Sequence, residues 1–383
     1  MKKRPLTPTM LDEVIDMQFK FHMPTKAYFG EGCVSQYGSE LTRFGDKAII
    51  VTGGKSARAS GALEDICNLL GQYNIEFSIF DKVENNPSTD TVKDGGIAAR
   101  QAGACFVIGI GGGSPLDAAK AVAVLAVNDI EPVQLFTNSF DSKPLPIIAI
   151  PTTAGTGSEV TPYSILTRGD LKTKVSFGTP DTFPAVAFLD PRYTQSQPAD
   201  VTVNTAIDAL SHCAEGYLSK RSTPVSDMLA QEGIRLFGRC IEHLQRGKVD
   251  LADRGELLYA SMLGGMVISH TGTTIVHGAG YNYTYFKGIP HGKANGYLMA
   301  EYLRFNYDHA KNKIDKLLDL LGLTCIDEFD NVIISLIGKA PCLTDAEIVE
   351  YAAITMTQRS TASNIRTVQA ADDIEEILRN VQS

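Results

Sequence analysis

Four side chains in the second half of the sequence are of types that together bind a transition metal. Asp208 and His212 are four residues apart, so a helix places them on one face, and His277 and His291 follow later in the chain. Asp208 and His212 lie among Ala, Leu and Ile residues, where a buried carboxylate needs a cationic partner. One carboxylate and three imidazoles suit Fe²⁺ or Zn²⁺ and do not suit Ca²⁺ or Mg²⁺. Taken alone, an Asp/His pair at this spacing is more often a surface hydrogen bond.

A glycine-rich turn in the first half of the sequence is suited to binding phosphate. The apolar run at residues 105–110 leads into Gly111-Gly112-Gly113-Ser114. Glycines at a strand-to-helix turn let main-chain N–H groups approach a phosphate, and the dipole of the following helix favours the negative charge. That helix carries Asp117, which we assign with the turn to cofactor binding. The alternative is a tight turn without a ligand.

A second turn of this kind follows the apolar run at residues 146–150. It contains Thr152, Thr153 and Thr156, whose hydroxyls can donate to phosphate or ribose oxygens. Alone, a solvated loop that caps a helix explains it equally well. Two such turns at the carboxyl ends of strands in one sheet favour a nucleotide, because open α/β sheets bind ligands at that edge.

The turn after the first strand of the expected sheet bears on the choice of nicotinamide cofactor. It reads Gly53-Gly54-Lys55-Ser56 and contains no carboxylate. An acidic residue near the adenine ribose favours NAD by accepting from its 2′-hydroxyl, and it repels the 2′-phosphate of NADP. The sequence therefore favours NADP(H) over NAD(H).

The pattern of apolar residues changes near the middle of the chain. Short β-branched runs alternate with helical stretches in the first half, as in a parallel sheet covered on both faces. From about residue 198 onward, apolar residues recur at helical spacing. We predict an α/β, Rossmann-like nucleotide-binding domain over residues 1–192 and an all-helical metal and substrate domain over residues 193–383. The expected strands are 47–52, 76–80, 105–110, 146–150 and 185–189, and the expected helices are 61–73, 89–102, 203–218, 224–244, 255–270 and 311–321.

The composition of the chain excludes several classes of partner. The 383 residues include 35 Lys and Arg against 44 Asp and Glu, a net charge of −9, so we expect neither nucleic acid nor an anionic membrane as a partner. No apolar run approaches the roughly 20 residues that span a bilayer. The basic N-terminus lacks the apolar segment of a secretory signal, and the seven cysteines contain no CxxC pair. We therefore expect a cytoplasmic protein.

These motifs together resemble the iron-containing (group III) alcohol dehydrogenase family. The resemblance covers the chain after its first sixteen residues, and it rests on GGGSPLDAAK, PTTAGTGSE, Asp190-Pro191, DALSHCAE and IPHGKAN in the family's order. It implies a Rossmann-like domain followed by a helical domain. It also implies that Asp208, His212, His277 and His291 bind the metal.

The same resemblance assigns residues to the nicotinamide cofactor. It implies that Gly111, Gly112, Gly113 and Ser114 bind the pyrophosphate, and that Thr152, Thr153 and Thr156 contact the cofactor. It further implies that Asn86-Pro87 lies near the adenosine half and that Lys174 reaches the nicotinamide ribose. Gly53 falls where NAD-using members tend to carry Asp, which agrees with the preference for NADP(H).

One position departs from the family pattern. Many members carry a further histidine four residues after the third metal ligand, where it is thought to relay a proton, and this sequence has Tyr281 there. A phenol can join a hydrogen-bonded relay, but it does not titrate near neutral pH as an imidazole does. We count Tyr281 among the catalytic candidates and leave the proton route open.

The function that follows is a metal-dependent, NAD(P)-linked alcohol dehydrogenase or aldehyde reductase, expected as a homodimer. Gly265, Ile268, Gly272 and Tyr281 suggest a small, mostly apolar pocket for a short-chain alcohol or aldehyde. Glycerol-dehydrogenase-like and dehydroquinate-synthase-like enzymes are rivals; the latter needs a pocket rich in Lys and Arg, and residues 265–295 contain only Lys287 and Lys293. A non-redox metal hydrolase is a further alternative that leaves both glycine-rich turns unexplained.

Overall fold

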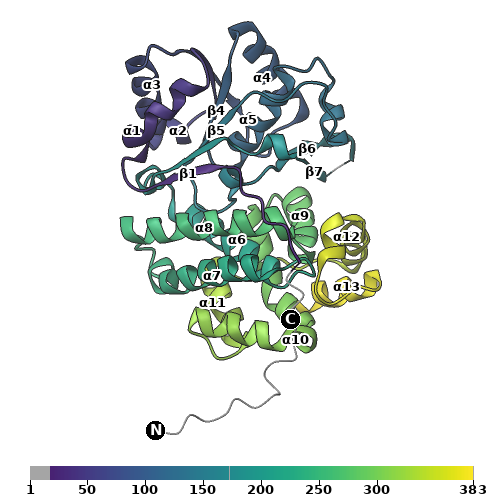
Figure 1. Ribbon diagram of the computed structural model, residues 1–383. Coiled ribbons are helices and arrows are strands. Elements are labelled where there is room, and N and C mark those ends of the chain that lie inside the picture. Colours follow the sequence, from purple (N-terminus) through teal and green to yellow (C-terminus); the bar gives the residue numbers. More distant parts are fainter. Residues whose placement is uncertain (1–17, 172, 383) are drawn as a thin grey trace.

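The computed structural model describes residues 18–171 and 173–382, and it divides into a sheet-containing half and a helical half (Figure 1). The N-terminal residues 1–17, where we expected no secretory signal, lie outside the described residues. Among the described helices, none is both long and apolar enough to cross a bilayer.

The first half is built on a six-stranded parallel sheet with the strand order β1-β8-β5-β4-β2-β3. β6 and β7 form a separate antiparallel hairpin. The chain moves from β2 to β3 on one side and then crosses to β4 on the other, so the sheet order reverses between β2 and β4. Ligands of open α/β sheets bind at such a reversal. The strands are β1 (Lys26–Phe29), β2 (Lys47–Gly53), β3 (Glu76–Val83), β4 (Phe106–Gly111), β5 (Ile147–Pro151), β6 (Ser164–Arg168), β7 (Thr173–Phe177) and β8 (Val186–Leu189).

The helices of the first half cover the sheet, and those of the second half pack on one another. Two separate apolar clusters lie on the two faces of the sheet, which explains the nearly continuous apolar character of β2, β4, β5 and β8. The first-half helices are α1 (Cys33–Tyr37), α2 (Ser56–Ala59), α3 (Ala62–Gln72), α4 (Thr89–Ala102) and α5 (Gly113–Leu125). The second-half helices are α6 (Ala199–Tyr217), α7 (Pro224–Gln245), α8 (Leu251–Thr271), α9 (Ile275–Lys287), α10 (His291–Leu321), α11 (Ile326–Ile337), α12 (Asp345–Thr357) and α13 (Ala371–Asn380).

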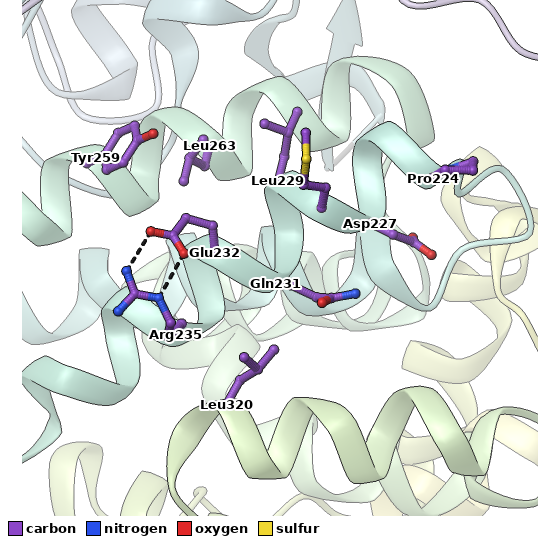
Figure 2. Close-up of a pocket in the computed structure, with 10 residues that line it drawn as sticks. Pro224, Asp227, Leu229, Gln231, Glu232, Arg235, Tyr259, Leu263 and Leu320 are labelled. Carbon is purple, nitrogen blue, oxygen red and sulfur yellow. Dashed lines mark hydrogen bonds and ion pairs between the residues drawn. The ribbon is translucent and has the colours of Figure 1, made fainter. Parts of the chain in front are cut away.

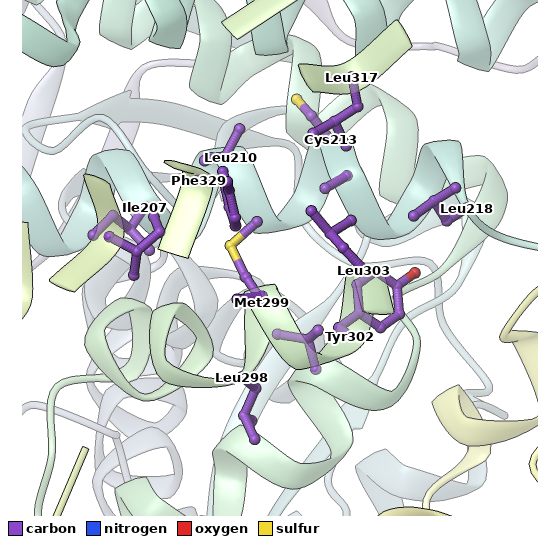
Figure 3. Close-up of a cluster of buried hydrophobic side chains, with 14 of the residues drawn as sticks. Ile207, Leu210, Cys213, Leu218, Leu298, Met299, Tyr302, Leu303, Leu317 and Phe329 are labelled. Atoms are coloured by element: carbon purple, nitrogen blue, oxygen red, sulfur yellow. The ribbon is translucent and has the colours of Figure 1, made fainter. Parts of the chain in front are cut away.

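The helical half has one large apolar core around α6. Figure 3 shows part of it, with Leu210 and Cys213 from α6 and with Met299 and Leu303 from α10. These side chains are at most 1% exposed. α6 is therefore held on its apolar sides, which fixes the direction of its polar side chains.

The five predicted strands are all present, each within three residues of its expected ends, and the predicted fold class is confirmed. Six predicted helices are also present, although the one expected at residues 311–321 is the end of the much longer α10, which is distorted at Ala310. The expectation gave no range for β1, the β6–β7 hairpin, the short helices α1 and α2, α9, the start of α10, or the C-terminal helices α11, α12 and α13. The proposed domain boundary near residue 192 falls between β8 and α6.

Candidate metal and nucleotide site

The two glycine-rich turns lie side by side at the carboxyl edge of the sheet. β4 and β5 are paired up to their last residues, and the Thr152 N–H donates to the Gly111 carbonyl at 2.8 Å. A Cβ on Gly112 would lie 3.2 Å from the Thr153 side chain, and one on Gly113 would lie 2.7 Å from that of Thr156. Glycine is therefore required for the turns to approach each other.

The second turn offers a buried polar atom that nothing in the described chain satisfies. The Thr152 hydroxyl oxygen has no hydrogen-bond partner, although the residue is only 2% exposed. A buried hydroxyl normally has a partner, because leaving it unpaired costs about 1–3 kcal/mol. An oxygen-rich ligand between the two turns would provide one, so the residues present fit a dinucleotide.

The predicted Asn-Pro pair lies next to the first turn. The Asn86 N–H donates to the Ser114 hydroxyl at 3.1 Å, and Asn86 has a positive φ of 58°. The Pro87 carbonyl accepts from the Thr167 N–H at 2.9 Å. The segment after β3 is thus brought to the same edge of the sheet as the turn after β4.

The turn after β2 completes this edge. A Cβ on Gly53 would lie 3.1 Å from the Val83 carbonyl and 3.8 Å from Pro115, which follows the first glycine turn. Gly54, Lys55 and Ser56 are exposed. The predicted adenosine-side residues therefore adjoin the pyrophosphate turn and are accessible.

We assigned Asp117 to cofactor binding, but its carboxylate makes hydrogen bonds within the protein. Its carboxylate accepts from the Ser158 hydroxyl at 2.5 Å and from the Ile165 N–H at 3.1 Å. Lys120, fully buried one turn later on α5, donates to Ser158 at 2.6 Å and to the Tyr163 carbonyl at 2.6 Å. Burial lowers the pKa of Lys120 to about 8, against the attraction of Asp117. Both side chains thus contact the loop that carries the second turn.

Three of the four predicted metal ligands form a compact group. Asp208 of α6, His277 of α9 and His291 at the start of α10 each offer a ligand atom, and these atoms lie within 4.8 Å of one another. The Asp208 carboxylate is 3.8 Å from Nε2 of each of the two histidines. The three residues come from three helices that are far apart in the sequence.

The fourth predicted ligand, His212, joins this group to the second turn. Its Nδ1 lies 3.2 Å from the Gly155 carbonyl, which can only accept, so Nδ1 carries the proton. His277 Nδ1 likewise faces the Glu215 carboxylate. The remaining ring nitrogens, Nε2 of His212 and Nε2 of His277, lie only 3.0 Å apart.

Two imidazole nitrogens that face each other at this separation need a positive charge between them, which a proton or a metal ion can supply. Nitrogen ligands at about 2.0–2.1 Å from one metal ion are about 2.9–3.4 Å apart, which matches the 3.0 Å between His212 and His277. Asp208 is 4% exposed, and its charge is costly to bury without such a partner. The donor set therefore fits a divalent transition metal.

Sequence reasoning missed two residues at this group, Glu215 and Asn295. Glu215 contacts His277 as described above, and the Asn295 amide nitrogen lies 3.1 Å from Asp208 Oδ1 and 3.2 Å from His277 Nε2. Glu215 follows Asp208 by seven residues, the spacing of one helical face. Asn295 follows His291 by four. Helical spacing from the ligands was the signal that could have revealed both.

Lys174 and Tyr281 lie beside the metal group. The Lys174 ammonium, on β7, is 5.9 Å from the centre of the Tyr281 ring, and that ring stacks on His291 with 5.1 Å between centres. Burial lowers the pKa of Lys174 to about 8, against attraction from Asp208. Burial, followed by the Asp208 and Glu215 charges, raises the pKa of Tyr281, so its phenol stays protonated at neutral pH.

One residue expected in a substrate pocket, Gly265, packs closely against the second turn. A Cβ on Gly265 of α8 would lie 2.6 Å from the Gly157 carbonyl oxygen, so the second turn rests directly on this helix. A surface hollow of about 730 Å³ lies elsewhere, beside α7, and contains the Glu232–Arg235 ion pair (Figure 2). None of the predicted site residues lines it.

Comparison with known proteins agrees with this fold. Residues 24–191 match the family model of iron-containing alcohol dehydrogenases, and residues 202–381 match that of their C-terminal domain. The chain is 32% identical to the 1,3-propanediol dehydrogenase of Klebsiella pneumoniae and 29% identical to the NAD-dependent methanol dehydrogenase of Bacillus methanolicus. The matches cover 79% of this chain and, respectively, 79% and 80% of those proteins.

A solved structure gives the same result. The crystal structure of an iron-containing alcohol dehydrogenase from Thermotoga maritima superposes with a TM-score of 0.88 at 37% identity, over 95% of this chain and 99% of that one. The protein belongs to the iron-containing alcohol dehydrogenase family, and the resemblance first seen in its motifs is confirmed. It is an oxidoreductase of the alcohol dehydrogenase class.

Proposed function

We propose that the protein is a metal-dependent enzyme that interconverts a short-chain alcohol and its aldehyde with a nicotinamide cofactor, preferably NADP(H). The observation that carries this proposal is the pair of facing Nε2 atoms of His212 and His277, which lie 3.0 Å apart and beside the Asp208 carboxylate. His212 also contacts Gly155 of the second turn, so a hydrogen bond joins the metal ligands to the edge of the sheet at which we expect the cofactor.

We assign the binding of Fe²⁺ or Zn²⁺ to Asp208, His212, His277 and His291. When bound, such an ion supplies Lewis acidity toward the oxygen of the alcohol or carbonyl. Gly155 and Glu215 hold the two histidine rings in one tautomer, so no reorganisation of these groups is needed during the reaction.

The cofactor is assigned to the carboxyl edge of the sheet. Main-chain groups of Gly111, Gly112 and Gly113 bind the pyrophosphate, and the unpaired Thr152 hydroxyl donates to the same ligand. Lys174 lies between the two halves of the site, because it is attracted to Asp208 at the metal ligands and to Asp117 on the helix that follows the first glycine-rich turn. Its positive charge orients the nicotinamide ribose.

The preference for NADP(H) is carried by the turn after β2. Gly53 and Gly54 present no carboxylate that would repel a 2′-phosphate, and the exposed Lys55 attracts one. A relative at 29% identity is an NAD-dependent methanol dehydrogenase, so cofactor preference must be measured on this chain.

The competing enzyme classes fit the site less well. A dehydroquinate-synthase-like lyase needs free basic side chains for a phosphorylated, carboxylated substrate. Lys287 is paired with Glu347, and Lys293 lies 6.0 Å from the Tyr297 ring. A metal hydrolase leaves the two adjoining glycine-rich turns without a role. We further propose a cytoplasmic location, in keeping with the seven free cysteines. We also propose that the protein is a homodimer.

A substrate panel on metal-loaded protein tests the proposal. We expect short alcohols and aldehydes to be turned over, with a higher kcat/KM for NADPH than for NADH. Chelation should abolish the activity, and Fe²⁺ or Zn²⁺ should restore it. Full activity after complete removal of metal, with none regained from the buffer, would overturn the proposal.

A further inference from the structure

Glu215 is a fully buried carboxylate that the sequence analysis assigned to neither the metal nor the cofactor. It lies on α6 seven residues after Asp208 and three after His212, with no exposed surface. A carboxylate in such surroundings is costly unless hydrogen-bond donors surround it. The hydrogen-bond donors around Glu215 therefore indicate its role.

All described hydrogen bonds of Glu215 come from the start of α9, the helix that carries His277. Its Oε1 accepts from the N–H and the hydroxyl of Thr274 at 2.8 Å each, and from the His277 N–H at 3.2 Å. Thr274 is the residue that precedes α9, and its own side chain does not cap the helix. Glu215 thus caps α9 from another helix, where the helix dipole also favours a negative charge.

The second oxygen of Glu215 contacts the ring of His277. Oε2 accepts from His277 Nδ1, so Nε2 is the ring nitrogen directed at His212 and Asp208. One carboxylate therefore fixes the position of the main chain at residue 277, the orientation of the ring and its tautomer. Carboxylates in this relation to a ligating histidine orient the ring and increase its basicity.

The charge of Glu215 also completes the electrostatics of the group. Three neutral imidazoles and Asp208 carry one negative charge, and Glu215 adds a second within the same buried volume. Two carboxylates balance a divalent cation, whereas one leaves a net positive charge in a medium of low dielectric.

We propose that Glu215 is a positioning residue for the metal, acting through His277 and the start of α9. The inference rests on the proposed metal site. Glu215 itself is not a ligand, because its oxygens are occupied by Thr274 and His277.

Glu215→Gln tests this directly, because the amide keeps the size of the side chain and removes its charge. We expect its affinity for Zn²⁺, measured by competition with a chromophoric chelator, to fall about 10- to 100-fold. The absorption spectrum of the Co²⁺-loaded variant should also change, since the ligand field depends on the orientation of His277. Neither readout depends on catalysis.

The chain offers a matched control in Asp253→Asn. Asp253 also contacts a histidine Nδ1, that of His243 at 2.7 Å, and it also accepts an N–H at the start of a helix, from Asp250 at 3.0 Å. This control should bind Zn²⁺ as the unaltered protein does. Affinity of Glu215→Gln equal to that of the control would overturn the inference.

Two further outcomes separate this inference from the proposed function. If the unaltered protein binds no Zn²⁺ or Fe²⁺, the proposed function fails and the inference with it. If Glu215→Gln does not fold, the Zn²⁺-loaded unaltered protein, labelled with ¹⁵N-histidine, decides by NMR. A protonated Nδ1 on His277 supports the inference, and a metal-bound Nδ1 with a protonated Nε2 overturns it.

Discussion

Gly292 of α10 lies directly against the main-chain carbonyl of Asn204 on α6. A Cβ on Gly292 would be 1.8 Å from that oxygen and 3.0 Å from the Cβ of Asp208. This contact between two helices holds His291, the first residue of α10, beside Asp208. Gly292 thus helps to bring the metal ligands together, because only a residue without a side chain lets α10 come this close to α6.

We therefore expect Gly292→Ala to separate α10 from α6 and to weaken the metal group. Main-chain atoms cannot rotate away, so the overpacking should lower the free energy of unfolding by about 1–3 kcal/mol. Zn²⁺ affinity should fall at least about tenfold. Urea denaturation and a chelator competition measure the two effects.

Gly71→Ala is the matched control. Gly71 lies in α3, and a Cβ there would meet nothing within 4 Å. Alanine should raise stability by about 0.5–1 kcal/mol, as it does in helices generally, and leave Zn²⁺ affinity unchanged. Equal metal affinity in the two variants would contradict the role assigned to Gly292.

A negative charge at residue 53 should reverse the preference for cofactor. In Gly53→Asp, a carboxylate near the 2′-phosphate costs about 1–4 kcal/mol at short range, so the ratio of kcat/KM for NADPH to that for NADH should fall at least about tenfold. Steady-state kinetics with both cofactors measure it. Gly53→Ala separates charge from size, since it adds the same Cβ 3.1 Å from the Val83 carbonyl. An equal effect of Ala and Asp would refute the charge argument.

Glu159 should make stability depend on pH. It is 1% exposed, its Oε1 has no partner, and burial raises its pKa to about 7, against the attraction of Lys120. The folded state therefore binds its proton more tightly than the unfolded state, whose carboxyl titrates near 4.5. Stability should fall as pH rises from about 4.5 to 7, and ionisation should cost up to about 3 kcal/mol above that window.

Glu159→Gln removes this titration. The free energy of unfolding of the metal-free protein, measured at several pH values, should decline less steeply between pH 4.5 and 7 in the variant than in the unaltered protein. Both proteins are compared without metal, so the titration of the metal-binding histidines contributes equally to the two pH profiles. Parallel pH profiles would show that Glu159 is not the titrating group.

The sequence predicted the parts of the molecule in which local pattern and burial agree. β2, β4, β5 and β8 are buried on both faces, so their apolar runs were unambiguous. β1 was missed because it is a short edge strand that is largely exposed, and its order depends on pairing with β8. α9 and the start of α10 contain several glycines, which favour no helix locally but allow close helix packing.

The candidate site likewise contains residues that the sequence could indicate and contacts that it could not. Asp208 and His212 share a helical face, and the glycine turns follow strands, so spacing alone could indicate them. Helical spacing from Asp208 and His291 could mark Glu215 and Asn295, but it could not reveal their partners, His277 and Asp208, which lie on other helices. The hydrogen bonds of Asp117 could not be foreseen either, because Ser158 and Ile165 approach it only in the folded chain.

The most direct measurement of the metal site is an anomalous difference map from crystals of the Fe²⁺- or Zn²⁺-loaded protein, recorded at the absorption edge of the metal. The account predicts one strong peak per chain, about 2.0–2.2 Å from Asp208, His212, His277 and His291. A peak elsewhere, or no peak among these four side chains in loaded protein, would contradict it.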